Sequence, residues 1–190
     1  MVDRAFIVAS VFSRRHEALI AAADAPGYPT VFGPESLRQA AVDWIERRFD
    51  VTGLSPSQVL PTVGSKELIA NLPTQLGLGA GDLIVVPELA YPTYEVGARY
   101  AGCEVVATDS TLSLGPRVPA IIFLNSPANP TGRILPPDHL RKVVDWARER
   151  GTLVVSDDGV GVVVLGNTGG LDGLGRVPDG LLETLQEGVQ

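Results

Sequence analysis

Two kinds of hydrophobic pattern alternate along the chain. Short runs of mainly branched apolar residues near positions 82–87, 103–108, 120–124 and 152–157 predict strands, and the first of them suits a strand buried on both faces of a sheet. Segments with apolar residues at helical spacing precede or separate these runs, near 34–49, 66–76, 94–101 and 135–150. This order predicts an α/β fold with a mostly parallel sheet and flanking helices.

The first of these helices shows the pattern clearly. Glu35 lies in its first turn and Arg47 and Arg48 lie in its last, which suits the helix dipole. We expect its apolar face to be formed by these residues: Leu37, Ala40, Ala41, Trp44 and Ile45.

Polar residues gather where the predicted strands end. Parallel sheets bind ligands beyond the carboxyl ends of their strands, so we place the candidate site there. Gly64 and Ser65 open the helix that contains Lys66, and a helix N-terminus of this kind suits a phosphate. Taken alone, a Gly-Ser start is also an ordinary helix cap.

The other strand ends carry an aromatic ring, an amide and a carboxylate. Tyr91 lies in the loop after the strand at 82–87, and Asn129 lies in the stretch NSPANPTG after the strand at 120–124. Singly, these two are also typical of packing and of a turn. Asp157 ends an apolar strand, where a carboxylate is costly unless a cation pairs with it. A ligand with a phosphate, a flat ring and a protonated ring nitrogen would satisfy the helix N-terminus, the aromatic ring and the carboxylate, and pyridoxal 5'-phosphate is such a ligand.

Composition removes several other classes of function. The 190 residues carry a net charge of −7 without a long basic run, so we expect no nucleic-acid partner. One cysteine, Cys103, and two histidines exclude an internal disulfide and a Cys/His metal cluster. The apolar run at 5–12 is too short to span a bilayer, so we expect no membrane association and a cytoplasmic protein.

Three segments resemble the fold-type I pyridoxal-phosphate aminotransferases of class I/II, above all the actinobacterial N-succinyldiaminopimelate aminotransferases of lysine biosynthesis. They are VLPTVGSKELIANLPTQLGLGAGDLIVVPELAYPTYEVGARYAG, LNSPANPTGRILPPDHLRKVVDWARERG and LVVSDD. The resemblance runs from about residue 26 to 158 and implies part of the large domain of that fold. It further implies an amino-acid or keto-acid substrate and a homodimer.

The resemblance also assigns roles to individual residues. It implies phosphate contacts from Gly64, Ser65 and Lys66, chiefly through backbone amides, and stacking of Tyr91 on the pyridine ring. Asn129 would bond the ring 3-oxygen, and Asp157 would pair with the protonated ring nitrogen. Tyr28, in YPTVFGPESLR, matches the tyrosine that reaches the phosphate of the neighbouring subunit.

The chain departs from this family pattern at several points. The family tyrosine that follows the ring-pairing aspartate by three positions is replaced by Val160. The family's Schiff-base lysine follows that aspartate, whereas the lysines here are Lys66 and Lys142. We therefore expect no catalytic residue in this chain and no activity from it alone. We expect a truncated or frameshifted member with an N-terminal segment at 1–33, a partial large domain at 34–158 and an irregular tail at 159–190.

Two alternatives remain open from the sequence. The chain is a non-catalytic remnant without a ligand, or the tail VVVLGNTGGLDG is a dinucleotide-binding turn of an oxidoreductase. The glycines of that turn would be Gly166, Gly169, Gly170 and Gly173. The second alternative is weakened because little chain remains for the helix and strand that should follow.

Overall fold

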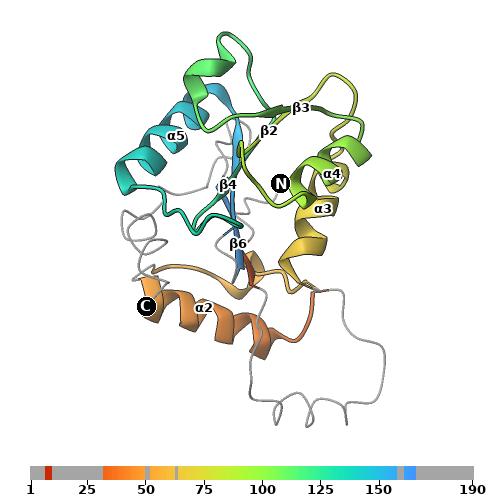
Figure 1. The fold of residues 1–190 in the computed structure, drawn as a ribbon. Coiled ribbons are helices and arrows are strands. Elements are labelled where there is room, and N and C mark those ends of the chain that lie inside the picture. The colour runs from red at the N-terminus through yellow and green to blue at the C-terminus, as the bar shows by residue number, and fades with distance from the viewer. Residues whose placement is uncertain (1–6, 10–31, 50–51, 63, 158–160, 166–190) are drawn as a thin grey trace.

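The computed structural model describes residues 7–9, 32–49, 52–62, 64–157 and 161–165. Their centre is a six-stranded sheet in the order β1-β6-β5-β4-β2-β3 (Figure 1). The strands are β1 (Ile7–Ala9), β2 (Leu83–Val86), β3 (Glu104–Ala107), β4 (Ile121–Asn125), β5 (Leu153–Asp157) and β6 (Gly161–Leu165). The helices are α2 (Glu35–Phe49), α3 (Ser65–Gln75), α4 (Thr93–Tyr100) and α5 (Pro137–Arg150), with short 3-10 turns η1 (Pro56–Gln58) and η2 (Thr111–Leu114).

The four strands predicted from the apolar runs form the parallel part of the sheet. β2 pairs in parallel with β3 and β4, and β4 pairs in parallel with β5. Every residue of β2 and β4 is buried, which explains why these strands read as unbroken apolar runs. The α/β fold class and the mostly parallel sheet are confirmed.

Helices cover both faces of this sheet. On one face, α3 and α4 pack through Leu68, Leu72 and Tyr94 against strand residues that include Ile84 and Phe123. On the other face, α5 packs against β2, β4 and β5 through its own apolar residues, Leu140, Val143, Val144 and Ala147. Figure 1 shows α5 on one side of the sheet and the α3–α4 pair on the other. This arrangement leaves the loops at the carboxyl ends of the strands free to build a site.

The predicted helices are present, but the buried face of α2 differs from the prediction. Its buried residues are Ala41, Val42 and Ile45, and the first two pack against Val59. Of the expected face, Trp44 is 41% exposed, and Leu37 and Ala40 are also exposed. The reason is that within the described residues α2 contacts the segment around η1 rather than the sheet, which buries a narrower stripe.

The expectation of an irregular tail from residue 159 is wrong for β6. This strand pairs antiparallel with β5 on one side and with β1 on the other. The sequence GVVVL is rich in valine, whose branched side chain favours strands, and the edge of β5 offers it unpaired backbone groups. Residues 166–190 lie outside the described part of the chain, and the proposed domain limits stay predictions.

Candidate active site

The ends of β4 and β5 form the centre of the candidate site. Asn125 and Asp157 are paired in register as the last residues of these adjacent strands. The Asn125 side chain donates from Nδ2 to the backbone oxygen of Asp157 at 2.9 Å. Its Oδ1 accepts the backbone N–H of Asn129 at 2.6 Å. One buried amide therefore joins the NPTG loop, which carries Asn129, to the strand end that carries Asp157.

Asp157 has a second anchor through its carboxylate. The residue is 9% exposed, and the Tyr94 hydroxyl donates to its Oδ2 at 2.7 Å. Burial raises the pKa of Tyr94 well above its usual range, and the charge of Asp157 and the hydrogen bond to it raise this pKa further. The phenol is therefore protonated over the whole physiological range and acts as the donor.

The Lys66 and Tyr91 side chains meet from two separate segments, the first turn of α3 and the loop before α4. The Lys66 ammonium donates to the Tyr91 hydroxyl at 3.0 Å and lies 5.2 Å from the centre of its ring. Lys66 is in the first turn of α3, and Tyr91 directly precedes Pro92, the N-cap of α4. Gly64 caps α3 with φ +98° and no side-chain cap hydrogen bond, and a Cβ there would meet nothing within 4 Å. The approach to this helix N-terminus from Gly64 is therefore open within the described residues.

The predicted residues thus form two bonded groups on neighbouring elements. In the first group, Lys66 bonds to Tyr91, and Gly64 and Ser65 precede Lys66 at the start of α3. In the second group, the Asn125 side chain bonds to the backbones of both Asn129 and Asp157. Tyr91 and Tyr94 connect the groups, since Tyr94 is one turn further along the same segment and bonds Asp157. That all six border one cleft of cofactor size stays a prediction.

Some predicted positions lie outside the described residues. Tyr28 and Val160 are among them, and so are the four glycines of the alternative dinucleotide turn. Their assignments therefore stay predictions.

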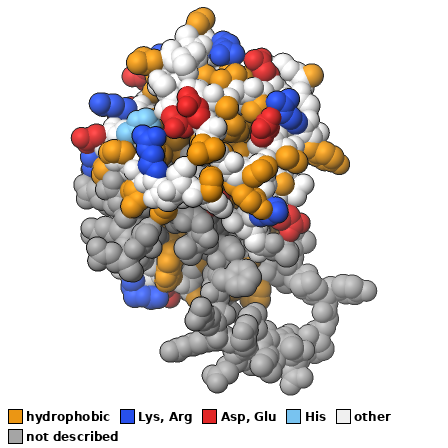
Figure 2. Space-filling view, viewed as in Figure 1, with side chains coloured by type: hydrophobic (Ala, Val, Ile, Leu, Met, Phe, Trp, Pro, Cys, Tyr) orange, Lys and Arg blue, Asp and Glu red, His pale blue; other side chains and the backbone are white. Residues whose placement is uncertain are grey.

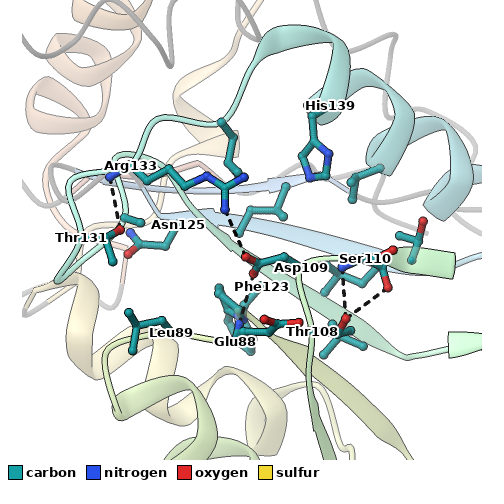
Figure 3. A pocket seen from close by; sticks show the side chains of 18 of the residues that line it. Glu88, Leu89, Thr108, Asp109, Ser110, Phe123, Asn125, Thr131, Arg133 and His139 are labelled. Atoms are coloured by element: carbon teal, nitrogen blue, oxygen red, sulfur yellow. Dashed lines mark hydrogen bonds and ion pairs between the residues drawn. The ribbon is translucent and has the colours of Figure 1, made fainter. Parts of the chain in front are cut away.

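A separate cavity of about 200 Å³ lies on the α5 side of the sheet. Figure 3 shows Arg133 reaching across its mouth to Asp109, an ion pair of 3.5 Å, and His139 directed toward it from α5. Its floor consists of buried apolar residues of the second core layer, including Ile122 and Leu124. None of the predicted cofactor-binding residues that the structure describes lines this cavity, but Asn125 does, so the cavity adjoins the candidate site at the end of β4.

Figure 2 shows acidic and basic side chains interspersed on one face of the molecule. Within the described ranges, no group of three or more histidine, cysteine, aspartate or glutamate side chains is placed to hold a metal ion. None of the helices in this part of the chain is both long and apolar enough to cross a membrane.

A match to a protein-family model shows the family to which this chain belongs. The family model for "Aminotransferase class I and II" matches residues 7–182. The chain belongs to this family. Class I and II aminotransferases depend on pyridoxal phosphate and act on amino acids and keto acids, so the cofactor inferred from the strand ends is the family's cofactor.

Individual aminotransferases are similar over most of this chain. It is 61% identical over 142 residues to the probable aminotransferase Rv1178 of Mycobacterium tuberculosis. The aligned region is 75% of this chain and 34% of that protein. It is 51% identical over 142 residues to the 4-dedimethylamino-4-oxo-anhydrotetracycline transaminase OxyQ of Streptomyces rimosus. That aligned region is 75% of this chain and 39% of OxyQ. The structure of the N-succinyldiaminopimelate aminotransferase from Mycobacterium tuberculosis superposes with a TM-score of 0.65 at 27% identity, covering 74% and 40%. This chain thus spans between a third and two fifths of the length of these relatives.

The described residues fit pyridoxal phosphate in their chemistry. A buried carboxylate at Asp157 suits a protonated ring nitrogen, because a nearby opposite charge favours the charged form of both groups. The start of α3 suits a phosphate, and Tyr91, 39% exposed, offers a ring for stacking.

Two residues that contact members of the candidate site were not identified from the sequence. Asn125 is the first asparagine of NSPANPTG, and Tyr94 follows Tyr91 by three positions. The available signal for Asn125 was the one used for Asp157, a polar residue closing a buried strand. Tyr94 lies on the buried face of a helix, so its sequence position predicts core packing and gives no sign of the hydrogen bond.

Proposed function

We propose that this chain is part of the large domain of an aminotransferase and binds pyridoxal 5'-phosphate reversibly at the carboxyl ends of its parallel strands. The observation that carries the proposal is Asp157, a buried carboxylate held at a strand end by Tyr94 and Asn125. In this proposal the protonated pyridine nitrogen pairs with the Asp157 carboxylate, and that nearby negative charge favours the protonated form of the ring nitrogen.

The other residues follow from this placement. The backbone amides of Gly64, Ser65 and Lys66 would hold the phosphate at the N-terminus of α3, and Tyr91 would stack on the ring. The Asn129 side chain would donate to the ring 3-oxygen, while its backbone is fixed by Asn125. When bound, the cofactor supplies an electron sink for the carbanion at the substrate's α-carbon, and Asp157 supports this by keeping the ring nitrogen protonated.

We propose further that this chain alone does not catalyse transamination. The reaction needs an amine that holds the cofactor and moves the proton at the substrate's α-carbon. The lysines of the chain are Lys66 and Lys142. Lys66 is engaged with the Tyr91 hydroxyl at the phosphate end, and Lys142 lies on α5, on the other face of the sheet.

Substrate, assembly and location are proposed from the family resemblance. An amino acid and a keto acid of the diaminopimelate route to lysine are the substrates we propose for the complete enzyme. OxyQ, by its name a 4-dedimethylamino-4-oxo-anhydrotetracycline transaminase, shows that one similar transaminase is named for another kind of molecule. We propose a cytoplasmic homodimer in which Tyr28 reaches the phosphate of the neighbouring subunit.

Equilibrium dialysis with pyridoxal 5'-phosphate tests the binding proposal. The native chain is expected to retain the cofactor, and Asp157→Asn is expected to weaken retention at least about tenfold, because a charge-assisted contact is lost. Asp138→Asn is the matched control, since Asp138 is exposed at the start of α5. Equal retention by the native chain and the Asp157 variant would contradict the proposed site.

A further inference from the structure

Tyr94 is a buried group that the family resemblance leaves without a role. It is 2% exposed, and its hydroxyl is 2.7 Å from Oδ2 of Asp157, a residue 63 positions away in the sequence. A tyrosine buried in a core packs through its ring, and its hydroxyl needs a hydrogen-bond partner. Here the partner is the carboxylate on which the proposed cofactor site depends.

The packing around Tyr94 fixes the position of its hydroxyl. Its ring packs on Phe123 of β4, with centres 5.2 Å apart and planes at 43°. One turn later, Gly97 brings α4 against α3 so closely that a Cβ there would be 2.6 Å from the Ala70 backbone oxygen. The tyrosine is therefore held by both the sheet and the neighbouring helix, and its donor is presented in one place.

The carboxylate is restrained from the backbone side as well. Asn125 donates to the Asp157 carbonyl, and the Ser126 N–H donates to the same oxygen at 3.2 Å. With its backbone fixed, the remaining freedom of Asp157 is rotation of the side chain, and the Tyr94 hydroxyl restrains that rotation. A donated hydrogen bond also favours the ionised form of a carboxylate, the form that pairs with a protonated ring nitrogen.

We propose that Tyr94 is a positioning residue of the cofactor site, whose hydroxyl keeps the Asp157 carboxylate ionised and in the orientation that receives the ring nitrogen of pyridoxal phosphate. This inference rests on the proposed function. Two tyrosines near the start of α4 then serve the cofactor site. Tyr91, before the helix, would stack on the cofactor ring, and Tyr94, within the helix, would hold the Asp157 carboxylate. Because the raised pKa keeps the phenol protonated, this support is expected to persist across the physiological pH range.

The test uses 4'-deoxypyridoxine 5'-phosphate labelled with ¹⁵N in the ring, which has no carbonyl and therefore binds without a lysine. Fluorescence titration gives its Kd, and the ¹⁵N chemical shift of the bound analogue reports protonation of the ring nitrogen. Tyr94→Phe is expected to weaken binding about tenfold and to move the ¹⁵N signal toward that of unprotonated pyridine. Tyr100→Phe, on the exposed face of the same helix, is the matched control and is expected to change neither.

The outcomes separate this inference from the proposed function. Equal affinity and equal ¹⁵N shift in the native chain and Tyr94→Phe would overturn the role of Tyr94 alone. Weaker binding with an unchanged ¹⁵N shift would also overturn it, because loss of packing alone gives that result. No binding by the native chain would overturn the proposed function together with this inference.

A measurement on the native chain covers the case in which Tyr94→Phe does not fold. The four tyrosines can be labelled with ¹³C at Cζ, and the Tyr94 signal assigned by elimination with phenylalanine variants at positions 28, 91 and 100. Saturation with the analogue is expected to shift the Tyr94 signal, because its hydroxyl bonds the carboxylate that receives the ligand. An unmoved signal at saturation would contradict the proposal.

Discussion

The Lys66 ammonium lies 3.0 Å from the Tyr91 hydroxyl and joins the start of α3 to the loop before α4 across 25 positions of sequence. Both residues are exposed, so the contact itself contributes little to stability. Its importance is positional, because it places the proposed phosphate end of the site beside the proposed ring-stacking residue.

Removing the Tyr91 ring is therefore expected to weaken cofactor binding while leaving the fold intact. Tyr91→Ala should raise the Kd for pyridoxal 5'-phosphate about tenfold, since stacking of an aromatic pair contributes about 1 kcal/mol beyond area burial. Tyr91→Phe should stay within about threefold of the native chain because it keeps the ring. Fluorescence titration measures both, with Lys142→Gln as a control on the far side of the sheet. Native affinity in Tyr91→Ala would show that the pyridine ring of the cofactor does not stack on Tyr91.

The contact of α3 with α4 is expected to be intolerant of any side chain at Gly97. A Cβ at this position would lie 2.6 Å from the Ala70 oxygen and 2.8 Å from its Cα, both backbone atoms that cannot turn aside. Gly97→Ala should lower the free energy of unfolding by about 1–3 kcal/mol through overpacking. Urea unfolding followed by circular dichroism measures the change.

Gly79→Ala is the matched control for this substitution. A Cβ at Gly79 would meet the Ala101 oxygen at an ordinary 3.6 Å. It should cost less than about 1 kcal/mol, given the usual size of surface effects. Equal losses in the two variants would show that the close approach at Gly97 is not what limits this position.

Asn125 is expected to matter for both stability and binding. Asn125→Ala removes the two hydrogen bonds that tie Asp157 to the NPTG loop, and it should lower the free energy of unfolding by about 1–3 kcal/mol. It should also weaken binding of pyridoxal phosphate, because the backbone of Asn129 loses its anchor. Asn71→Ala, which removes an exposed side chain that bonds within α3, is the control and should change neither quantity much. An Asn125 variant with native affinity would show that the loop holds its position by other means.

Cys103 offers an internal probe of whether the core around α3 and α4 is closed. It is 7% exposed, and burial together with the nearby charge of Asp82 raises the pKa of its thiol. Reaction with Ellman's reagent at pH 8 should be at least about a hundredfold slower in the native chain than in urea, because only the thiolate of an opened state reacts. A Cys103→Ala chain carrying Thr74→Cys, at an exposed position of α3, should react rapidly in both conditions. Fast reaction of native Cys103 would mean that this core layer opens readily.

Much of the fold could be predicted because the central parallel strands β2, β4 and β5 are largely buried, whereas β3 is partly exposed. Their apolar runs LIVV, IIFL and LVV end at or shortly before Val86, Asn125 and Asp157, and each strand lies within a residue or two of its predicted limits. The strand β6 was not predicted, although its valines favour a strand, because its pairing depends on the free edge of β5. Pairing with an edge strand is a tertiary contact, and a local sequence pattern does not predict it.

The candidate site divides in the same way. Lys66, Tyr91, Asn129 and Asp157 stand at element ends, where sequence order and the geometry of parallel sheets predict convergence. The bonds of Tyr94 and Asn125 join residues 63 and 32 positions apart, and they depend on which face each side chain takes after packing. Sequence patterns therefore predicted which residues belong to the candidate site, and the structure shows the hydrogen bonds that join Asn129 and Asp157 to Asn125 and Tyr94.

Borohydride reduction in the presence of pyridoxal 5'-phosphate, followed by peptide mass spectrometry, tests the central claim most directly. The claim is that this chain holds the cofactor through Asp157 and the start of α3 without a covalent link. The expected result is saturable retention of the cofactor before reduction, with no stable label on Lys66 or Lys142 and no amino-group transfer from glutamate to a keto acid. Stable labelling of Lys66 together with amino-group transfer, or no retention of the cofactor at all, would contradict it.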